Sequence, residues 1–227
     1  MLWYKAWLET RWRFVFTIGS MLLLLGTIGP LLVAPPEGVS RALKLGSILL
    51  YCFAALFLAG SGINSQTTYA ATSGFHGSML FTLSLPISRR QLFFVRVGLG
   101  AIETCIFVAL MAGITLYWTP TGASALQAFQ YGARAIICTM AVYSLSVLLA
   151  CVLDEMWQFT GSCFCLGAAL FLQFKFPLVR ALSPLRGMSL WSYPITAPMP
   201  WAPLITSVML TGVLLYASVL VLQRKEY

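Results

Sequence analysis

Very few residues of this sequence could do chemistry, and the most conspicuous ones lie inside long apolar runs. Glu103 stands about a dozen residues into the run that begins near Leu92, where a carboxylate is costly unless it is paired or neutral. Arg96 lies two helical turns earlier on the same face, about 10 Å away along the axis. Glu103 therefore has either a structural role, paired with Arg96 or with a neighbouring helix, or a role in substrate passage or gating.

A second polar set occurs in a later apolar run. Gln127, Gln130 and Arg134 follow one another at steps of three and four residues, which places them on one face of a helix. They lie near the expected outer end of that run. One interpretation is that Arg134 extends to the membrane interface. The other is that the three residues form a polar lining of an outward exit.

Motifs for catalysis, metal binding and nucleotide binding are absent from the sequence. It contains no Gly-x-Ser-x-Gly, no His-Glu-x-x-His and no Gly-x-x-x-x-Gly-Lys-Ser/Thr pattern. His76 is the single histidine, and the six cysteines lie within apolar runs without clustered metal-ligand spacing. We therefore expect no catalytic residue, no bound cofactor and no metal in this chain, and we interpret the cysteines as small packing residues.

The composition is that of an integral membrane protein. Hydrophobic residues make up 59% of the 227 residues, charged residues make up 9%, and the mean hydropathy is +0.87. Soluble domains carry about 25% charged residues, so this chain could not cover a water-facing surface. The net charge of +8 comes from scattered Lys and Arg, which is typical of anchoring at lipid head groups and does not indicate a nucleic-acid partner.

We predict an all-α polytopic membrane protein that forms one domain over residues 1–227. Residues 2–13 alternate Trp and Tyr with Lys and Arg, which favours an amphipathic elbow helix at the membrane surface. Residues 175–200 hold five of the eleven prolines and predict short helices or re-entrant pieces at the outer face. The six predicted spans cover about 14–33, 45–64, 92–118, 125–153, 156–174 and 201–222.

The distribution of Lys and Arg predicts the orientation of these spans. With six spans both termini lie on one side, together with Arg89, Arg90 and Arg96. That side carries more basic residues than the other, so the positive-inside rule places it in the cytoplasm. We expect a multi-pass protein of the cell inner (plasma) membrane with both termini cytoplasmic.

The segment 74–90, between the second and third predicted spans, has a pattern of its own. Met79, Leu83 and Ile87 recur at helical spacing and predict an amphipathic helix. Pro86 should end or bend that helix, and Arg89 and Arg90 give it a cationic edge. Such a helix can lie on a membrane surface or bind in the groove of a soluble partner.

This segment resembles the cytoplasmic coupling segment of type-2 ABC exporter permeases. The family typically shows Gly-Thr, an apolar amphipathic turn and then Leu-Pro-Val-Ser-Arg, with the proline nine residues after the glycine. Gly77 and Pro86 have that spacing, and the run 85–89 reads Leu-Pro-Ile-Ser-Arg. The layout of elbow, six spans and basic C-terminal tip is also similar. The chain departs from the family at Phe75, His76 and Leu80, where acidic and basic residues are usual, so a more apolar contact is expected.

The resemblance implies a permease subunit of an ATP-driven exporter. Two such subunits, identical or different, would form the pathway, and a separate ATP-binding cassette ATPase would carry ATP and Mg. The residues implied in ATPase coupling are Gly77, Met79, Leu83, Pro86, Ile87, Arg89 and Arg90. The substrate class, whether drug, lipid or peptide, is left open. The alternatives are a non-catalytic membrane assembly or scaffold protein and an ion-gradient-driven secondary transporter.

Overall fold

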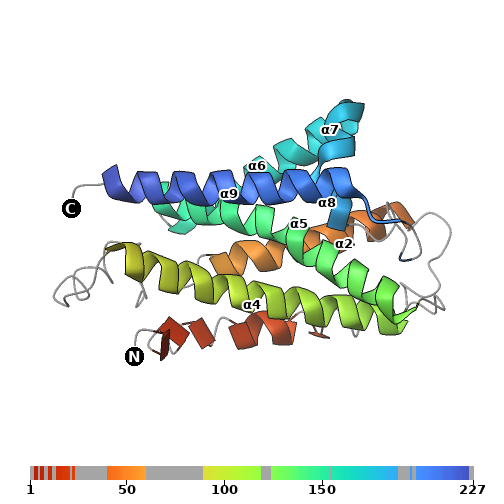
Figure 1. Ribbon diagram of the computed structural model, residues 1–227, viewed down its shortest axis with the longest axis horizontal. Helices are drawn as coiled ribbons and strands as arrows, with labels where there is room; N and C mark the ends of the chain where they lie inside the picture. The colour runs from red at the N-terminus through yellow and green to blue at the C-terminus, as the bar shows by residue number, and fades with distance from the viewer. Residues whose placement is uncertain are drawn as a thin grey trace.

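The computed structural model describes residues 3–4, 6–7, 10–11, 14–20, 22–23, 40–59, 89–118, 124–153, 155–188, 195 and 198–224. These residues are almost entirely helical and include no strand. Figure 1 shows them as an elongated bundle. The helices are α2 (Ser40–Ala59), α4 (Arg89–Trp118), α5 (Ala125–Val152), α6 (Glu155–Lys175), α7 (Pro177–Leu182), α8 (Pro184–Met188) and α9 (Trp201–Arg224).

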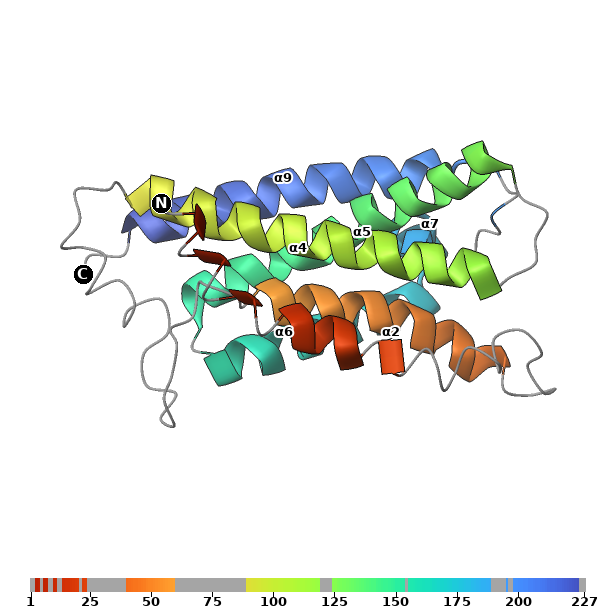
Figure 2. The ribbon, with the colours of Figure 1, turned by 90° about the horizontal axis from the view of Figure 1, so that it is seen from below.

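The five long helices run alternately between two ends of the bundle. The Arg89 end holds the start of α4 and the ends of α2, α5 and α9, while the Trp118 end holds the end of α4 and the starts of the other three (Figures 1 and 2). Helix α6 runs from the Arg89 end back to the Trp118 end. Helix α2 (40–59) is therefore antiparallel to α4 (89–118), and α4 is antiparallel to α5 (125–152).

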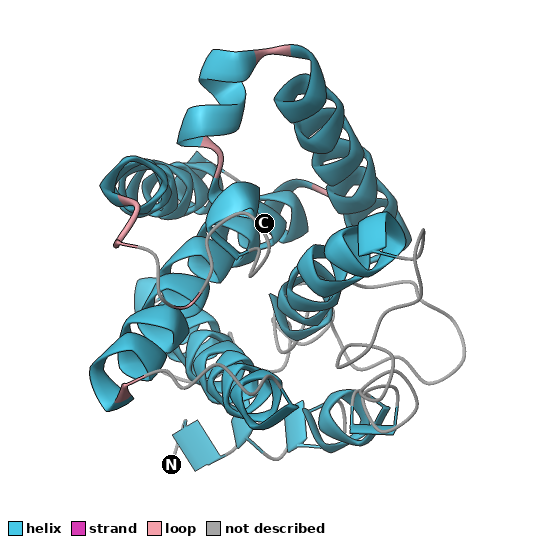
Figure 3. Ribbon diagram, turned by 90° about the vertical axis from the view of Figure 1, so that its right-hand side faces the viewer, coloured by secondary structure: helices cyan, strands magenta, loops and turns pink. Residues whose placement is uncertain are grey.

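Helix α5 is the centre of the bundle. It packs against α2, α4, α6, α8 and α9, and Figure 3 shows the helical bundle seen along its length. Its buried face is rich in small side chains, including Ala135, Cys138, Ala141 and Ala150. Small residues let neighbouring helix backbones approach closely, which is how helices pack in membranes without a hydrophobic driving force between them.

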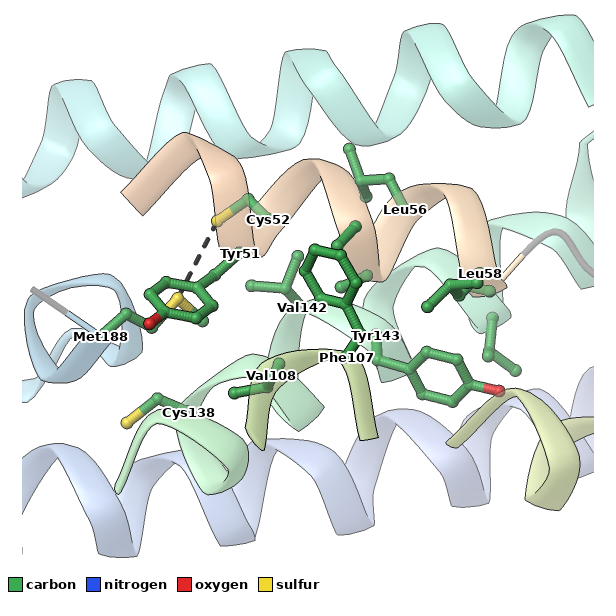
Figure 4. Close-up of a cluster of buried hydrophobic side chains, with 14 of the residues drawn as sticks. Tyr51, Cys52, Leu56, Leu58, Phe107, Val108, Cys138, Val142, Tyr143 and Met188 are labelled. Carbon is green, nitrogen blue, oxygen red and sulfur yellow. Dashed lines mark hydrogen bonds between the residues drawn. The ribbon is translucent and has the colours of Figure 1, made fainter. Parts of the chain in front are cut away.

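The main apolar core joins α2, α4, α5 and α8. Phe107 and Val108 of α4 are almost fully buried against Tyr143 and Val147 of α5, and Figure 4 shows several of these side chains between the helices. Three of the six cysteines, Cys52, Cys138 and Cys151, lie in this core, and all six are free thiols. The buried cysteines thus act as small core residues.

The segment 175–200 contains the short helices α7 and α8. Helix α8 buries Leu185, Gly187 and Met188, and Met188 Sδ lies 4.0 Å from Cys52 Sγ (Figure 4). At 1.5 Å per residue, Cys52 is about 18 Å along α2 from its start. Helix α8 is therefore inserted into the bundle from the Trp118 end. Helix α7, by contrast, lies on the outside and has no buried residue.

The described part of the N-terminal segment is helical and lies against α4. Ala6 packs between Val95 and Leu99, and the ring of Trp3 lies next to Gly98. Figure 2 shows these first pieces of chain passing over α4. Of the apolar arc predicted within 2–13, Ala6 is buried, whereas Trp3 and Trp7 are 49% and 37% exposed, so each indole is only partly covered by the bundle.

Within the described residues, three helices are long and apolar enough to cross a membrane. They are Phe93–Tyr117, Ala125–Val152 and Trp201–Arg224, and they coincide with the predicted spans 92–118, 125–153 and 201–222. The predicted span 156–174 is helical as α6, which carries Gln158 and Gln173 and is not one of the three. Helix α2 begins five residues before the predicted span 45–64. Residues 24–33 and 60–64 of the first two predicted spans lie outside the described residues.

Candidate functional site

Glu103 lies at the middle of α4 and is 1% exposed. The hydroxyl of Thr10 donates a hydrogen bond of 2.5 Å to its Oε1, across 93 residues of sequence. Among the described residues, its Oε2 has no hydrogen-bond partner. The group that meets this carboxyl is therefore a hydroxyl of the N-terminal segment. The sequence left two structural partners open for Glu103, namely Arg96 or a neighbouring helix. The partner in the structure is Thr10, which belongs to the helical N-terminal segment.

The backbone around Glu103 is held tightly against α5. Tyr143 Oη donates to the carbonyl of Val97 at 2.7 Å, and a Cβ on Gly100 would lie 2.6 Å from that same hydroxyl oxygen. Thr104 turns its hydroxyl back to the carbonyl of Gly100 at 2.8 Å. The half of α4 that carries Glu103 is thus fixed between the N-terminal segment on one side and α5 on the other.

Arg134 is buried in the half of the bundle nearer the Trp118 end. It is 4% exposed and its guanidinium lies 5.3 Å from the ring centroid of Tyr131, within cation–π range. Arg134 is therefore covered by other parts of the chain and is not exposed on the surface of the described bundle. Its stacking partner is on the same helix, one turn nearer the start of α5.

Three hydroxyl groups from three helices meet beside Arg134. Tyr51 of α2 and Tyr131 of α5 lie with their hydroxyl oxygens 3.2 Å apart, and Thr115 of α4 lies close enough to interact with both tyrosine side chains. We call Tyr51, Thr115, Tyr131 and Arg134 the Arg134 cluster. It is the point at which α2, α4 and α5 make polar contact in an otherwise apolar core.

The two glutamines predicted to share a face with Arg134 have different surroundings. Gln130 lines a small pocket together with Tyr131 and Arg134, closed on its other side by Ile195, Met199 and Pro200. Gln127 instead completes a capping box with Ser124, since each side chain bonds the other's backbone N–H. Gln127 therefore caps the start of α5. Of the two glutamines, Gln130 is the one that lines the pocket with Arg134.

Most of the residues predicted to couple to an ATPase are not among the residues that the structure describes. Gly77, Met79, Leu83, Pro86 and Ile87 lie outside the described residues. Arg89 and Arg90 are the first two residues of α4. Within the described chain, no group of three or more His, Cys, Asp or Glu side chains could hold a metal ion.

Thr10, Tyr51, Thr115 and Tyr131 were not singled out by sequence reasoning. Each is an ordinary residue in its own segment, and its importance arises from partners on other helices. The capping role of Gln127 did have a local signal, because Ser124-x-x-Gln127 is the capping-box pattern.

No family model, curated protein or solved structure matches this chain. The site must therefore be interpreted from its own geometry. It consists of two buried charged residues at different depths: a carboxyl held by the N-terminal segment and a guanidinium held by an aromatic ring.

Proposed function

We propose that this chain is the membrane subunit of an ATP-driven exporter, working with a separate ATP-binding subunit and a second permease subunit. The observation that carries the proposal is the continuity between the 74–90 segment and α4. Arg89 and Arg90, the last residues of that segment, are already the first residues of a helix that continues without a break to Trp118. A displacement of the segment would therefore be passed along α4.

The length and packing of α4 suit this role. Thirty residues at 1.5 Å each make a rod of about 45 Å, enough to cross the hydrocarbon core of about 30 Å. The rod carries Glu103 at its middle, and it contacts α2 and α5. Movement of α4 would change the relative positions of all three helices that contribute hydroxyls to the Arg134 cluster, which lies nearer the opposite end.

The positions of the helix ends in the bundle also support the proposal. The start of α4, the end of α2 and the end of α9 lie at the Arg89 end of the bundle (Figure 1). In an exporter this end would face the cytoplasm, where the ATP-binding subunit is found. Coupling residues 77–90 would then dock by the apolar stripe Met79, Leu83 and Ile87, while the arginines bind partner acids or lipid phosphates.

A second permease subunit would find a large apolar surface on α9. Apart from Pro203, Leu204, Ser207, Ser218 and Leu222, the described side chains of α9 are partly or fully exposed. In a membrane this surface can face lipid or another permease. Formation of a dimer would be tested by the mass of the purified particle in non-ionic detergent.

Co-purification with an ATP-binding subunit, sought among the proteins encoded by the neighbouring genes, tests the proposal. Leu83→Asp places a charge in the apolar stripe and should abolish association, because an unpaired carboxylate does not enter an apolar groove. Ser84→Asp adds the same charge one residue away, on another side of the predicted helix, and should preserve association. Equal association of wild type and Leu83→Asp, with equal ATPase stimulation, would favour the scaffold or secondary-transporter alternatives.

A further inference from the structure

Residues 174–182, at the corner between α6 and α7, form a continuous exposed stretch. Every side chain from 174 to 182 is exposed, and α7 has no buried residue. Most of these side chains are large and apolar, namely Phe174, Phe176, Leu178, Val179 and Leu182. A contiguous apolar surface of this kind marks a site that contacts a membrane or another protein.

Helix α7 is held in a fixed place but is too short to cross a membrane. Phe176 is extended and Pro177 is the first residue of α7, so the chain turns where proline cannot continue α6. Ser183, directly after α7, donates a hydrogen bond of 2.8 Å to Gln173 of α6, and both residues are buried. The six residues of α7 make about 9 Å, against a hydrocarbon core of about 30 Å. A short exposed helix of this composition fits the membrane surface.

The contact between α7 and α9 gives the depth of α7. The hydroxyl of Thr206 donates to the carbonyl of Leu182, the last residue of α7, at 2.6 Å. Thr206 lies about 8 Å along α9 from Trp201, and Figure 1 shows α7 beside the start of α9. Trp201 is 68% exposed, and tryptophan favours the membrane–water boundary. Helix α7 therefore ends at the depth of about 5–10 Å that is typical of interfacial helices.

Two cations accompany the apolar side chains. Lys175 is the last residue of α6, Arg180 lies in the last turn of α7, and both are exposed. The sequence has no Asp or Glu between Met156 and Lys225, so this part of the chain presents positive charge alone. Long basic side chains can keep their stems in the apolar layer while the charge reaches the head groups. The surface is therefore complementary to acyl chains that carry anionic phosphate head groups.

We infer that residues 174–182 are a lipid anchor, in which the apolar side chains insert among acyl chains while Lys175 and Arg180 bind the phosphate head groups of anionic lipids. The anchor fixes the Trp118 end of the bundle in its leaflet. A second copy of this chain fits the surface less well, because a symmetric contact would bring the same cations of both copies together. The inference does not depend on the proposed export function.

Photo-crosslinking of the purified full chain in phosphatidylcholine nanodiscs tests the anchor, with mass spectrometry of the labelled peptides as the measurement. The probes are phosphatidylglycerol and phosphatidylcholine with the same acyl chains and a diazirine close to the head group, each at the same trace level. Both should label residues 174–182, because the stretch lies in lipid. Phosphatidylglycerol should label it at least about fivefold more, since one basic residue near an anionic head group contributes about that factor.

The variants separate the charged part of the anchor from the apolar part, and all are at exposed positions. Lys175→Gln combined with Arg180→Gln should bring labelling by the two lipids within about twofold of each other. Leu178→Asp should lower labelling by both lipids, because a carboxylate is costly in the acyl layer. Arg224→Gln, at the other end of the bundle, is the matched control and should leave labelling of 174–182 unchanged.

Absence of lipid labelling at 174–182 would overturn the anchor, and a second copy of the chain covering this surface would give that result. Equal labelling of wild type by the two lipids would also overturn it, as would a preference for phosphatidylglycerol that survives in the Lys175→Gln and Arg180→Gln double variant. The assay contains no ATP-binding subunit. Its outcome is therefore separate from that of the Leu83→Asp association test, and either can fail alone.

Discussion

The hydroxyl of Thr10 donates to Oε1 of Glu103 at 2.5 Å, joining the N-terminal segment to the middle of α4. Glu103 is buried at a depth where a bare carboxyl is expensive, and Thr10 is itself 2% exposed. The contact therefore fixes the N-terminal segment to the helix that we propose transmits force from the ATPase. Together with the packing of Ala6 against Val95 and Leu99, it joins the N-terminal segment to α4 at two places.

Removing the donor of this pair should destabilise the protein. Thr10→Val leaves a buried carboxyl without a hydrogen bond among the described residues and should cost about 1–3 kcal/mol. Adding Glu103→Met to Thr10→Val should restore most of the loss, because both polar groups are then replaced by apolar ones. Thermal unfolding in detergent measures both. Thr211→Val is the control, since its hydroxyl bonds to Ser207 within its own helix; a loss of equal size there would contradict the account.

The close contact between α4 and α5 predicts a second pair of variants. Gly100→Ala would place a Cβ 2.6 Å from Tyr143 Oη and 3.2 Å from the Leu58 carbonyl oxygen, so it should destabilise by about 1–3 kcal/mol through overpacking. Tyr143→Phe removes the nearer oxygen, and the double variant should lose less than the sum of the single losses.

Gly113→Ala is the matched control on the same helix. A Cβ there would meet nothing within 4 Å, so the change should be neutral or stabilise by up to about 1 kcal/mol, as alanine favours a helix over glycine. Additive losses in the Gly100→Ala and Tyr143→Phe pair would show that the two residues are not in contact.

The insertion of α8 between the long helices predicts a third pair. A Cβ on Gly187 would overlap the Sγ of Cys138, so Gly187→Ala should push α8 away from α5 and lower the unfolding temperature. Cys138→Ala removes the sulfur and should relieve much of that loss in the double variant. Gly167→Ala on α6, where a Cβ would meet nothing within 4 Å, should have little effect. An unchanged unfolding temperature for Gly187→Ala would mean that α8 is not held against Cys138.

The capping box of α5 predicts a smaller effect. Ser124→Ala removes the side-chain acceptor for the backbone N–H of Gln127 and should cost about 1 kcal/mol. Ser124→Asp keeps an acceptor oxygen at the cap and should retain most of the stability. The two unfolding temperatures, measured side by side, separate loss of the cap from loss of the serine itself.

Much of the fold could be predicted from the sequence because long apolar runs are a local signal. The ranges of α4, α5 and α9 differ from the expected spans by three residues or fewer at each end, and Arg89 and Arg90, the last residues of the predicted segment 74–90, already belong to α4. The short helices α7 and α8 lie in the proline-rich stretch for the same reason, since proline interrupts a helix.

The polar contacts could not be predicted in the same way. The partner of Glu103 is 93 residues away, and Tyr51 and Tyr131 are 80 residues apart. No periodicity relates such pairs, because they depend on which helices become neighbours. Arg134 illustrates the difference: its position near a helix end was readable from the sequence, but its burial beside Tyr51 and Tyr131 depends on the packing of α2 against α5.

The central claim is that a cytosolic segment between α2 and α4 is bound by a nucleotide-driven partner, and labelling of a single added cysteine tests it most directly. Ser84→Cys would be exposed to a membrane-impermeant maleimide in inside-out and right-side-out vesicles, with the unmodified chain as the background for the six native cysteines. The account predicts labelling in inside-out vesicles alone, and protection when the ATP-binding subunit is bound. Labelling from right-side-out vesicles, or labelling that the bound subunit leaves unchanged, would contradict it.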